Sequence, residues 1–228
     1  MMLVETIAGD LPLVERVWSA TCDTATDFTT VAKGSSMIAF ARSGHRVTVH
    51  VRGPETKATE LTCPAGWEFF GVELRRGAFL PMHPPSGLLD LNDALLPTGS
   101  GDRVVLDNRD WELPTPQNVD VFIRRLVRAG LLVVDPVVDD IRHGEQPRAL
   151  SERSAQLRFR RAVGISNRQL ASIERAQRAA QFLAGGGSIA DAVVVGDYYD
   201  QPQLTRAMRQ ATGHTPGELR SGTAFLAL

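Results

Sequence analysis

The sequence predicts an α+β protein in which a β-rich N-terminal part precedes an all-helical C-terminal part. Hydrophobic residues alternate with a period of two up to about residue 80, and after Asn118 their period becomes 3.6 residues. Charge is also divided: residues 1–150 hold 15 Lys+Arg and 20 Asp+Glu, whereas residues 151–228 hold 10 basic residues, all arginine, and 6 acidic ones. A basic balance at one end is typical of a protein with an anionic partner.

Four short runs between residues 13 and 80 predict the strands of the β-rich part. Each is rich in β-branched and aromatic residues: LVERVWSA, SSMIAFAR, HRVTVHVR and WEFFGVEL. Val47, Val49 and Val51 alternate with polar residues, as one buried strand face requires, and Ser43–Gly44 predicts a tight hairpin turn. Residues 81–117 are rich in Pro and Gly and predict a loop-rich connection.

Capping residues and hydrophobic spacing predict the helices that follow. Phe122, Leu126 and Ala129 would form the inner face of a first helix, and Asp135–Pro136 would open a second. Further helices are expected at about 151–163, 166–184, 188–195 and 201–211, and from Thr215 onward. This order reads helix–turn–helix, long connecting helix, helix–turn–helix. Such units brace a helix so that its N-terminal end can enter the major groove of DNA.

Residues 135–220 resemble the DNA-binding region of AraC/XylS-type bacterial transcription regulators. The segments that carry the resemblance are LSERSAQLRFRRAVGIS at 150–166 and GSIADAVVVGDYYDQPQLTRAMRQATGHTP at 187–216. It implies an AraC-type DNA-binding domain at 135–228, a linker and connecting helix at 113–134, and a β-rich sensor or dimerisation domain, often a cupin-like barrel, at 1–112.

The resemblance also implies which side chains contact DNA. Helices 151–163 and 201–211 would be recognition helices in adjacent major-groove segments. The residues expected to read bases are Arg153, Gln156, Gln201, Gln203 and Arg206. Phosphate contacts, which fix register without reading sequence, are expected from Arg158, Arg160, Arg161, Thr205 and Arg209. The chain departs from the family pattern at Leu157, where a basic residue is common, at Asp197, where glycine is usual, and in the long turn GEQPRAL.

The N-terminal part leaves two interpretations open. Trp18, Trp67 and Phe69 could line the pocket of a small-molecule effector, or belong to the core as most strand aromatics do. The histidines His45, His50 and His83 lack a tight ligand motif, so we expect no metal and no other cofactor. The scattered Ser, His and Asp residues form no nucleophile motif, so we expect no catalytic residue.

The expected function is that of a sequence-specific transcriptional regulator, not an enzyme. Its expected partners are double-stranded DNA, an effector, a second copy of the chain and, for an activator, RNA polymerase. Two alternatives are a protein-interaction adaptor that keeps the fold without binding DNA, and a cupin-type metal enzyme with a helical tail.

Location can also be predicted from the sequence. No apolar run is long enough to span a membrane, and MMLVETIAGDLPLVERVW lacks the features of a secretory signal. Cys22 and Cys63 lie far apart and form no metal or redox motif, so we expect two buried or half-buried thiols in a reduced, cytoplasmic protein.

Overall fold

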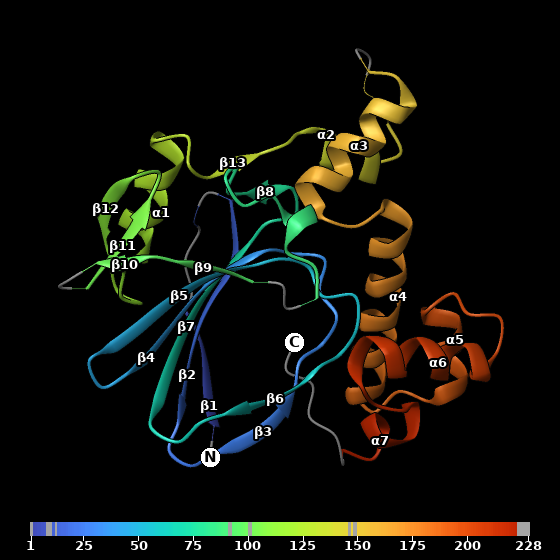
Figure 1. Cartoon of the computed structure of the whole chain (residues 1–228). Coiled ribbons are helices and arrows are strands. Elements are labelled where there is room, and N and C mark those ends of the chain that lie inside the picture. Colours follow the sequence, from blue (N-terminus) through green and yellow to red (C-terminus); the bar gives the residue numbers. More distant parts are fainter. Residues whose placement is uncertain are drawn as a thin grey trace. The chain divides into compact units, whose positions relative to one another are not determined.

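The structure, a computed structural model, describes residues 2–7 (backbone only), 11, 13–90, 93–99, 102–145, 147 and 150–222. Strands dominate the N-terminal part and helices the C-terminal part, which confirms the predicted α+β class (Figure 1). The chain forms two compact units. Unit 1 comprises Met1–Thr26, Ser35–Pro54 and Cys63–Ile165, and unit 2 comprises Asp27–Gly34, Glu55–Thr62 and Ser166–Leu228. The units thus divide the chain differently from the predicted limits at residues 112 and 134.

The main sheet of unit 1 is antiparallel and has the strand order β1-β2-β7-β4-β5-β9. Its strands are β1 (Met2–Ile7), β2 (Val14–Cys22), β4 (Met37–Ser43), β5 (Arg46–Arg52), β7 (Trp67–Leu74) and β9 (Ala94–Leu96). The four predicted strand runs are confirmed, and so is the hairpin, in which Ser43 pairs with Arg46. Gly44 has φ +57° in its turn, a conformation that glycine adopts without steric cost.

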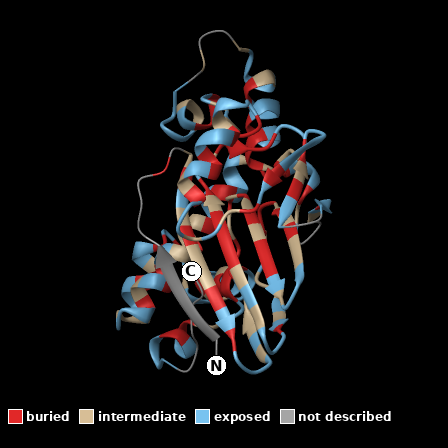
Figure 2. Cartoon of the chain, turned by 90° about the vertical axis from the view of Figure 1, so that its left-hand side faces the viewer, coloured by how far each residue is buried: buried red, intermediate tan, exposed pale blue. Residues whose placement is uncertain are grey.

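The core of unit 1 joins this sheet to helix α1 (Val119–Arg128). Phe40 stacks on Phe70 with ring centroids 5.2 Å apart, and Phe122 of α1 meets Phe40 edge-on at 6.2 Å. Along the strands, buried residues are interspersed with half-buried and exposed ones (Figure 2). Leu126 faces inward as predicted. The prediction was wrong for Ala129, which is exposed at the C-cap because the helix ends at Arg128.

The prediction of a loop-rich connection at 81–117 was wrong, because this segment holds several short strands and a 3₁₀ helix. They are a 3₁₀ helix (Pro85–Gly87), β9, and a three-stranded sheet of β10 (Thr98–Gly99), β11 (Arg103–Leu106) and β12 (Arg109–Glu112). Asp107 and Asn108 both have positive φ between β11 and β12, as a two-residue hairpin turn requires. Two further strands, β8 (Ala78–Phe79) and β13 (Val133–Val134), pair with each other. Strands of two to four residues are too short to show hydrophobic alternation.

The predicted helices are confirmed, with the chain passing from unit 1 to unit 2 between the third and the fourth. Unit 1 contains α2 (Val137–Arg142) and α3 (Glu152–Val163). Unit 2 contains α4 (Asn167–Ala184), α5 (Ile189–Val195), α6 (Gln201–Thr212) and α7 (Pro216–Arg220). From α3 onward each helix begins after a residue whose side chain accepts a bond from the backbone N–H three positions later: Ser151, Ser166, Ser188, Asp200 and Thr215.

Unit 2 also contains an arm made of residues 27–34 and 55–62, which we call the β3–β6 arm. Its strands β3 (Thr26–Thr29) and β6 (Glu60–Cys63) pair with each other. Lys33 and Glu55 exchange two backbone hydrogen bonds of 2.8 and 2.9 Å. The arm is bonded to the helices of its own unit, since the Ala32 N–H donates to Ala211 O (2.7 Å).

Cys22 and Cys63 form a disulfide, with their Cα atoms 6.4 Å apart. Both residues are buried, as predicted, but the prediction of two free thiols was wrong. Forty-one positions separate the two cysteines in sequence. The paths of β2 and β6, rather than any local motif, bring them together.

Candidate nucleic-acid interface

Helix α6 has one buried face and one exposed polar face. Leu204, Met208 and Ala211 are buried, the first two at 0% exposure. Leu204 and Met208 belong, together with Leu183 of α4 and Leu219 of α7, to the hydrophobic core of unit 2. The opposite face exposes Gln201, Gln203, Arg206 and Arg209. Core packing therefore fixes which side of α6 faces a partner.

The N-terminal end of α6 is held by two hydrogen bonds. Asp200 Oδ1 accepts from the Gln203 N–H (2.7 Å), and Gln203 Oε1 accepts from the Tyr199 N–H (2.8 Å). The Gln203 carbonyl is thereby occupied, which leaves its NH₂ group to donate to a base edge. Thr205 donates its hydroxyl to Gln201 O within the helix (2.9 Å), so it can offer a phosphate only acceptor lone pairs or a rearranged hydroxyl.

The turn between α5 and α6 is anchored to α4 by an arginine that the sequence analysis missed. Arg175 lies 5.4 Å from the ring centroid of Tyr198 and donates to Asp197 O (3.3 Å). Asp197 has φ +52°, so it adopts the left-handed conformation for which the family pattern has glycine. Only the fold brings Arg175 to this turn, which lies 22 residues further along the chain.

Tyr198 is buried, and its hydroxyl has no hydrogen-bond partner among the described residues. Burial raises the pKa of Tyr198, although the charges of Arg175 and Arg178 act in the opposite direction. A buried hydroxyl without a partner costs free energy. We therefore expect Tyr198→Phe to raise the free energy of unfolding by about 1 kcal/mol, measured by urea titration. The control is Tyr199→Phe, which should change nothing because Tyr199 is 93% exposed. A less stable Tyr198→Phe variant would contradict the expectation.

Helix α7 contributes Leu219 to the core of unit 2. Thr215 and Glu218 form a capping box at its start. The Thr215 N–H donates to Glu218 Oε2 (2.7 Å), and the Thr215 hydroxyl donates to the same oxygen (2.9 Å). These bonds lower the pKa of Glu218.

Helix α3 shows the same division into two faces within unit 1. Ala155, Phe159 and Ala162 are buried as predicted. The exposed residues include the predicted base readers Arg153 and Gln156, and the predicted phosphate ligands Arg158, Arg160 and Arg161. Gln156 donates to Glu152 Oε1 (3.1 Å).

Three features distinguish α3 from α6. Arg158 donates twice to the Asp135 carboxylate, from Nε (3.1 Å) and from Nη2 (2.7 Å), and Leu157 is 59% exposed. The connection that precedes α3 runs from residue 143 to 151, whereas α5 and α6 are joined by residues 196–200. Parts of the predicted turn GEQPRAL, at residues 146, 148 and 149, lie outside the described residues.

The three aromatic residues predicted for an effector pocket share one face of the main sheet. Trp67 and Phe69 stack with centroids 6.0 Å apart, and Trp18 lies over Gly71, where a Cβ would collide with its ring. The core residues Phe70 and Val72 alternate with them along β7, so this face is the one turned away from the core. All three aromatics are half-buried.

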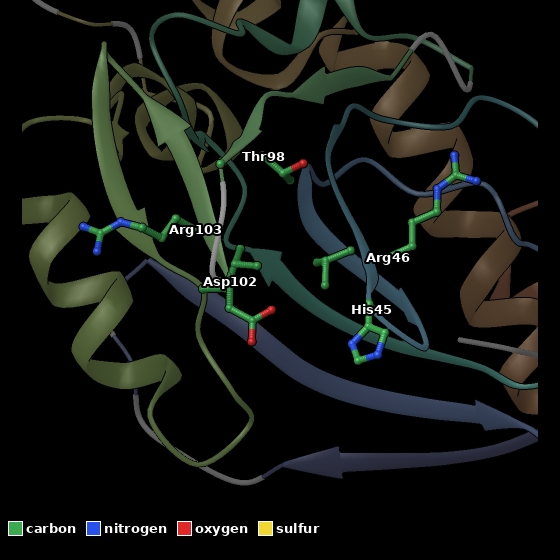
Figure 3. Close-up of a pocket in the computed structure, with 8 residues that line it drawn as sticks. His45, Arg46, Thr98, Asp102 and Arg103 are labelled. Atoms are coloured by element: carbon green, nitrogen blue, oxygen red, sulfur yellow. The ribbon is translucent and has the colours of Figure 1, made fainter.

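The pocket drawn in Figure 3 lies elsewhere in unit 1 and has a volume of about 330 Å³. It is lined by His45, Arg46, Val47, Thr98, Gly99, Asp102, Arg103 and Leu113. The side chains of Arg46 and Arg103 extend in opposite directions (Figure 3), and Asp102 is paired with Arg42 at 3.2 Å. These charges do not converge on one point, so the pocket has no evident ligand chemistry.

In the described part of the chain, no three His, Cys, Asp or Glu side chains form a group that could hold a metal ion. His45 belongs to the polar pocket, His50 lies on β5 and His83 follows β8. Burial lowers the pKa of His83. Among the described helices, none has the length and apolar character needed to cross a membrane.

Comparison with known proteins gives a match to one family. Residues 148–222, about a third of the chain, match the sequence model of a family described as "Helix-turn-helix domain". No curated protein and no solved structure matches the chain. The matched segment begins just before α3 and ends just after α7, so it contains both helices predicted to read DNA. The chain therefore carries a helix-turn-helix domain of the AraC type, the DNA-binding part of a transcription regulator.

Proposed function

We propose that the protein is a sequence-specific transcriptional regulator whose recognition helices are α3 and α6. The observation that carries this proposal is the exposed face of α6. There Gln201, Gln203 and Arg206 project from the first half of a helix whose other face is fully packed. A helix presented by its N-terminal end, with amide and guanidinium donors, suits base edges in the major groove.

The roles proposed for individual residues are those that the family resemblance implies, and the exposure of the arginine and glutamine side chains supports them. Base readout is assigned to Arg153 and Gln156 on α3 and to Gln201, Gln203 and Arg206 on α6. Phosphate contact is assigned to Arg160 and Arg161 on α3 and to Thr205 and Arg209 on α6. Arg158 would have to share its bonds with Asp135 to reach a phosphate, so we propose it as the weakest of these ligands.

Arg206→Ala tests the base-reading role. We expect a loss of about 1–3 kcal/mol in binding to the preferred site and a smaller loss on random duplexes, because a base contact contributes only at its own sequence. The preferred site would first be selected from random-sequence DNA, and affinities would then be measured by fluorescence anisotropy. Arg220→Ala is the control, since it removes an exposed arginine outside both recognition helices. An equal loss on specific and random DNA would reduce Arg206 to a phosphate ligand.

We propose that the β-rich part binds an effector or mediates dimerisation. If the protein activates transcription, we propose that it also contacts RNA polymerase. The half-buried aromatic face of Trp18, Trp67 and Phe69 supports effector binding. We also propose that the protein acts in the cytoplasm, where bacterial DNA lies, and that it is not an enzyme. Sedimentation of the full chain with and without its selected DNA site would test dimerisation.

A protein-interaction adaptor is the second candidate function. Leu157, 59% exposed on α3, favours it, because an apolar side chain stands where a basic one would help to bind DNA. Failure to bind any duplex in 50 mM salt or less, where nonspecific electrostatic binding is strong, would make the adaptor the better proposal.

A further inference from the structure

We propose that Cys22 and Cys63 form a redox-active site whose substrate is a dithiol reductant, and that its state controls how firmly the β3–β6 arm holds α6. The link to DNA binding rests on the function proposed above. A protein that acts on DNA in the cytoplasm meets reducing conditions, under which a disulfide is rarely a permanent cross-link. Disulfides of such proteins are most often transient and catalytic or redox-sensing.

The position of the disulfide ties it to the arm. The chain passes from unit 1 to unit 2 after Thr26, returns to unit 1 for Ser35–Pro54, and after the second segment of the arm returns to unit 1 again at Cys63. Cys22 thus lies just before the first strand of the arm, and Cys63 is the last residue of the second. Near the same end of the arm, Thr62 donates to Asp27 Oδ1 (2.7 Å). The disulfide therefore lies at the end of the arm where β3 begins and β6 ends, whereas the Lys33–Glu55 bonds lie at the other end.

The arm reaches the recognition helix through backbone hydrogen bonds. The N–H of Ala32 donates to Ala211 O (2.7 Å), and the N–H of Ala58 donates to Gln210 O (2.8 Å). Both acceptors lie in the last turn of α6. Gln177 of α4 adds a bond from Nε2 to Ala32 O (2.7 Å). The arm thus binds the C-terminal end of α6 and leaves the exposed N-terminal residues free for DNA.

The arm packs closely as well as forming hydrogen bonds, since Val31 and Ala32 are 1% and 0% exposed. A Cβ at Gly213 would lie 2.9 Å from Thr29 Cγ2, so arm and helix end approach closely there. Beside this point a hollow of about 530 Å³ is lined by residues of the arm together with Gly213 and His214. The arm meets the end of α6 through these bonds beside an open hollow, so this part of the contact depends on the arm being held in its conformation.

Reduction would proceed by thiol–disulfide exchange. One thiolate of the dithiol attacks Cys22 or Cys63 and forms a mixed disulfide, and its second thiolate then displaces the protein sulfur. The reductant becomes a disulfide, and the protein gains two electrons and two protons as two thiols. Both cysteines are 2% exposed, but the short segments 23–25 and 64–66 beside them are exposed. Local opening of these segments would admit the reductant.

The test compares the oxidised and reduced full chain, without and with its selected DNA. Dithiothreitol serves as the dithiol, and alkylation with mass spectrometry counts the thiols. We expect two thiols to appear under native conditions and hydrogen exchange at the Ala32 and Ala58 amides to quicken about tenfold, while amides of β4 keep their protection. DNA affinity should fall about fivefold or more, in the range typical of coupled sites. The double variant Cys22→Ala, Cys63→Ala should behave as the reduced protein under both conditions.

Three results would overturn the proposal: a disulfide that native protein keeps in excess dithiothreitol, unchanged exchange at Ala32 and Ala58 after reduction, or equal DNA affinity in the two states. Absence of DNA binding in both states would count against the proposed function instead. Hydrogen exchange would in that case still decide whether the disulfide controls the arm.

Discussion

Replacing both Cys22 and Cys63 by alanine is expected to lower the free energy of unfolding by about 2–4 kcal/mol. The cross-link spans 41 positions, so in the unfolded chain it closes a long loop and removes many conformations. Chain-entropy arithmetic for a loop of this length gives about 4 kcal/mol, and measured effects are commonly smaller. Equilibrium urea unfolding of oxidised wild type and variant would give the difference.

Alanine is preferred to serine for this experiment because both sites are buried, at 2% exposure. A serine hydroxyl placed there would need a hydrogen-bond partner and would add a cost unrelated to the cross-link. Reduced wild-type protein provides the matched control, since it loses the cross-link but keeps both side chains. If the reduced protein were as stable as the oxidised one, the disulfide would contribute nothing to stability, and the expectation would fail.

The features predicted well from sequence are those decided by a few neighbouring residues. Asp200 caps α6 because its carboxylate reaches an N–H three positions on, and this geometry is local. The exposed face of α6 follows from the 3.6-residue spacing of Leu204, Met208 and Ala211. Asp197 could also be recognised as a substitute for glycine, because Asp is one of the few residue types that tolerate positive φ and this preference is local.

The features that the sequence did not reveal depend on distant segments. The disulfide needs β2 and β6 to end side by side, and the arm needs residues 32 and 211 to meet. Nothing in the composition of 27–34 or 55–62 indicates that they belong with the C-terminal helices. The pair of Arg158 with Asp135 is similar, since it spans 23 positions and changes the expected availability of a predicted DNA ligand.

Raising the salt concentration from 50 to 200 mM is expected to weaken binding to the selected DNA site by roughly 40- to 500-fold. The lower figure counts three phosphate contacts, from Arg160, Arg161 and Arg209, at a slope of about −0.9 each in log affinity against log salt. The higher figure adds Arg153 and Arg206, which are assigned to bases but whose positive charges would also displace counterions from the neighbouring phosphates. All five side chains are exposed. A salt series by fluorescence anisotropy with the full oxidised chain gives the slope.

Two variants separate the contribution of individual arginines to this slope. Arg209→Ala should reduce its magnitude by about 1, because one phosphate contact and its released counterion are lost. Arg158→Ala should leave the slope nearly unchanged, because that guanidinium already lies against the Asp135 carboxylate at 2.7 Å. Since both changes remove one positive charge, net charge alone predicts equal effects, whereas the local pairing predicts different ones. A slope near zero for the wild type would mean that the arginines of α3 and α6 do not contact phosphate, and the adaptor would then be the better account of this fold.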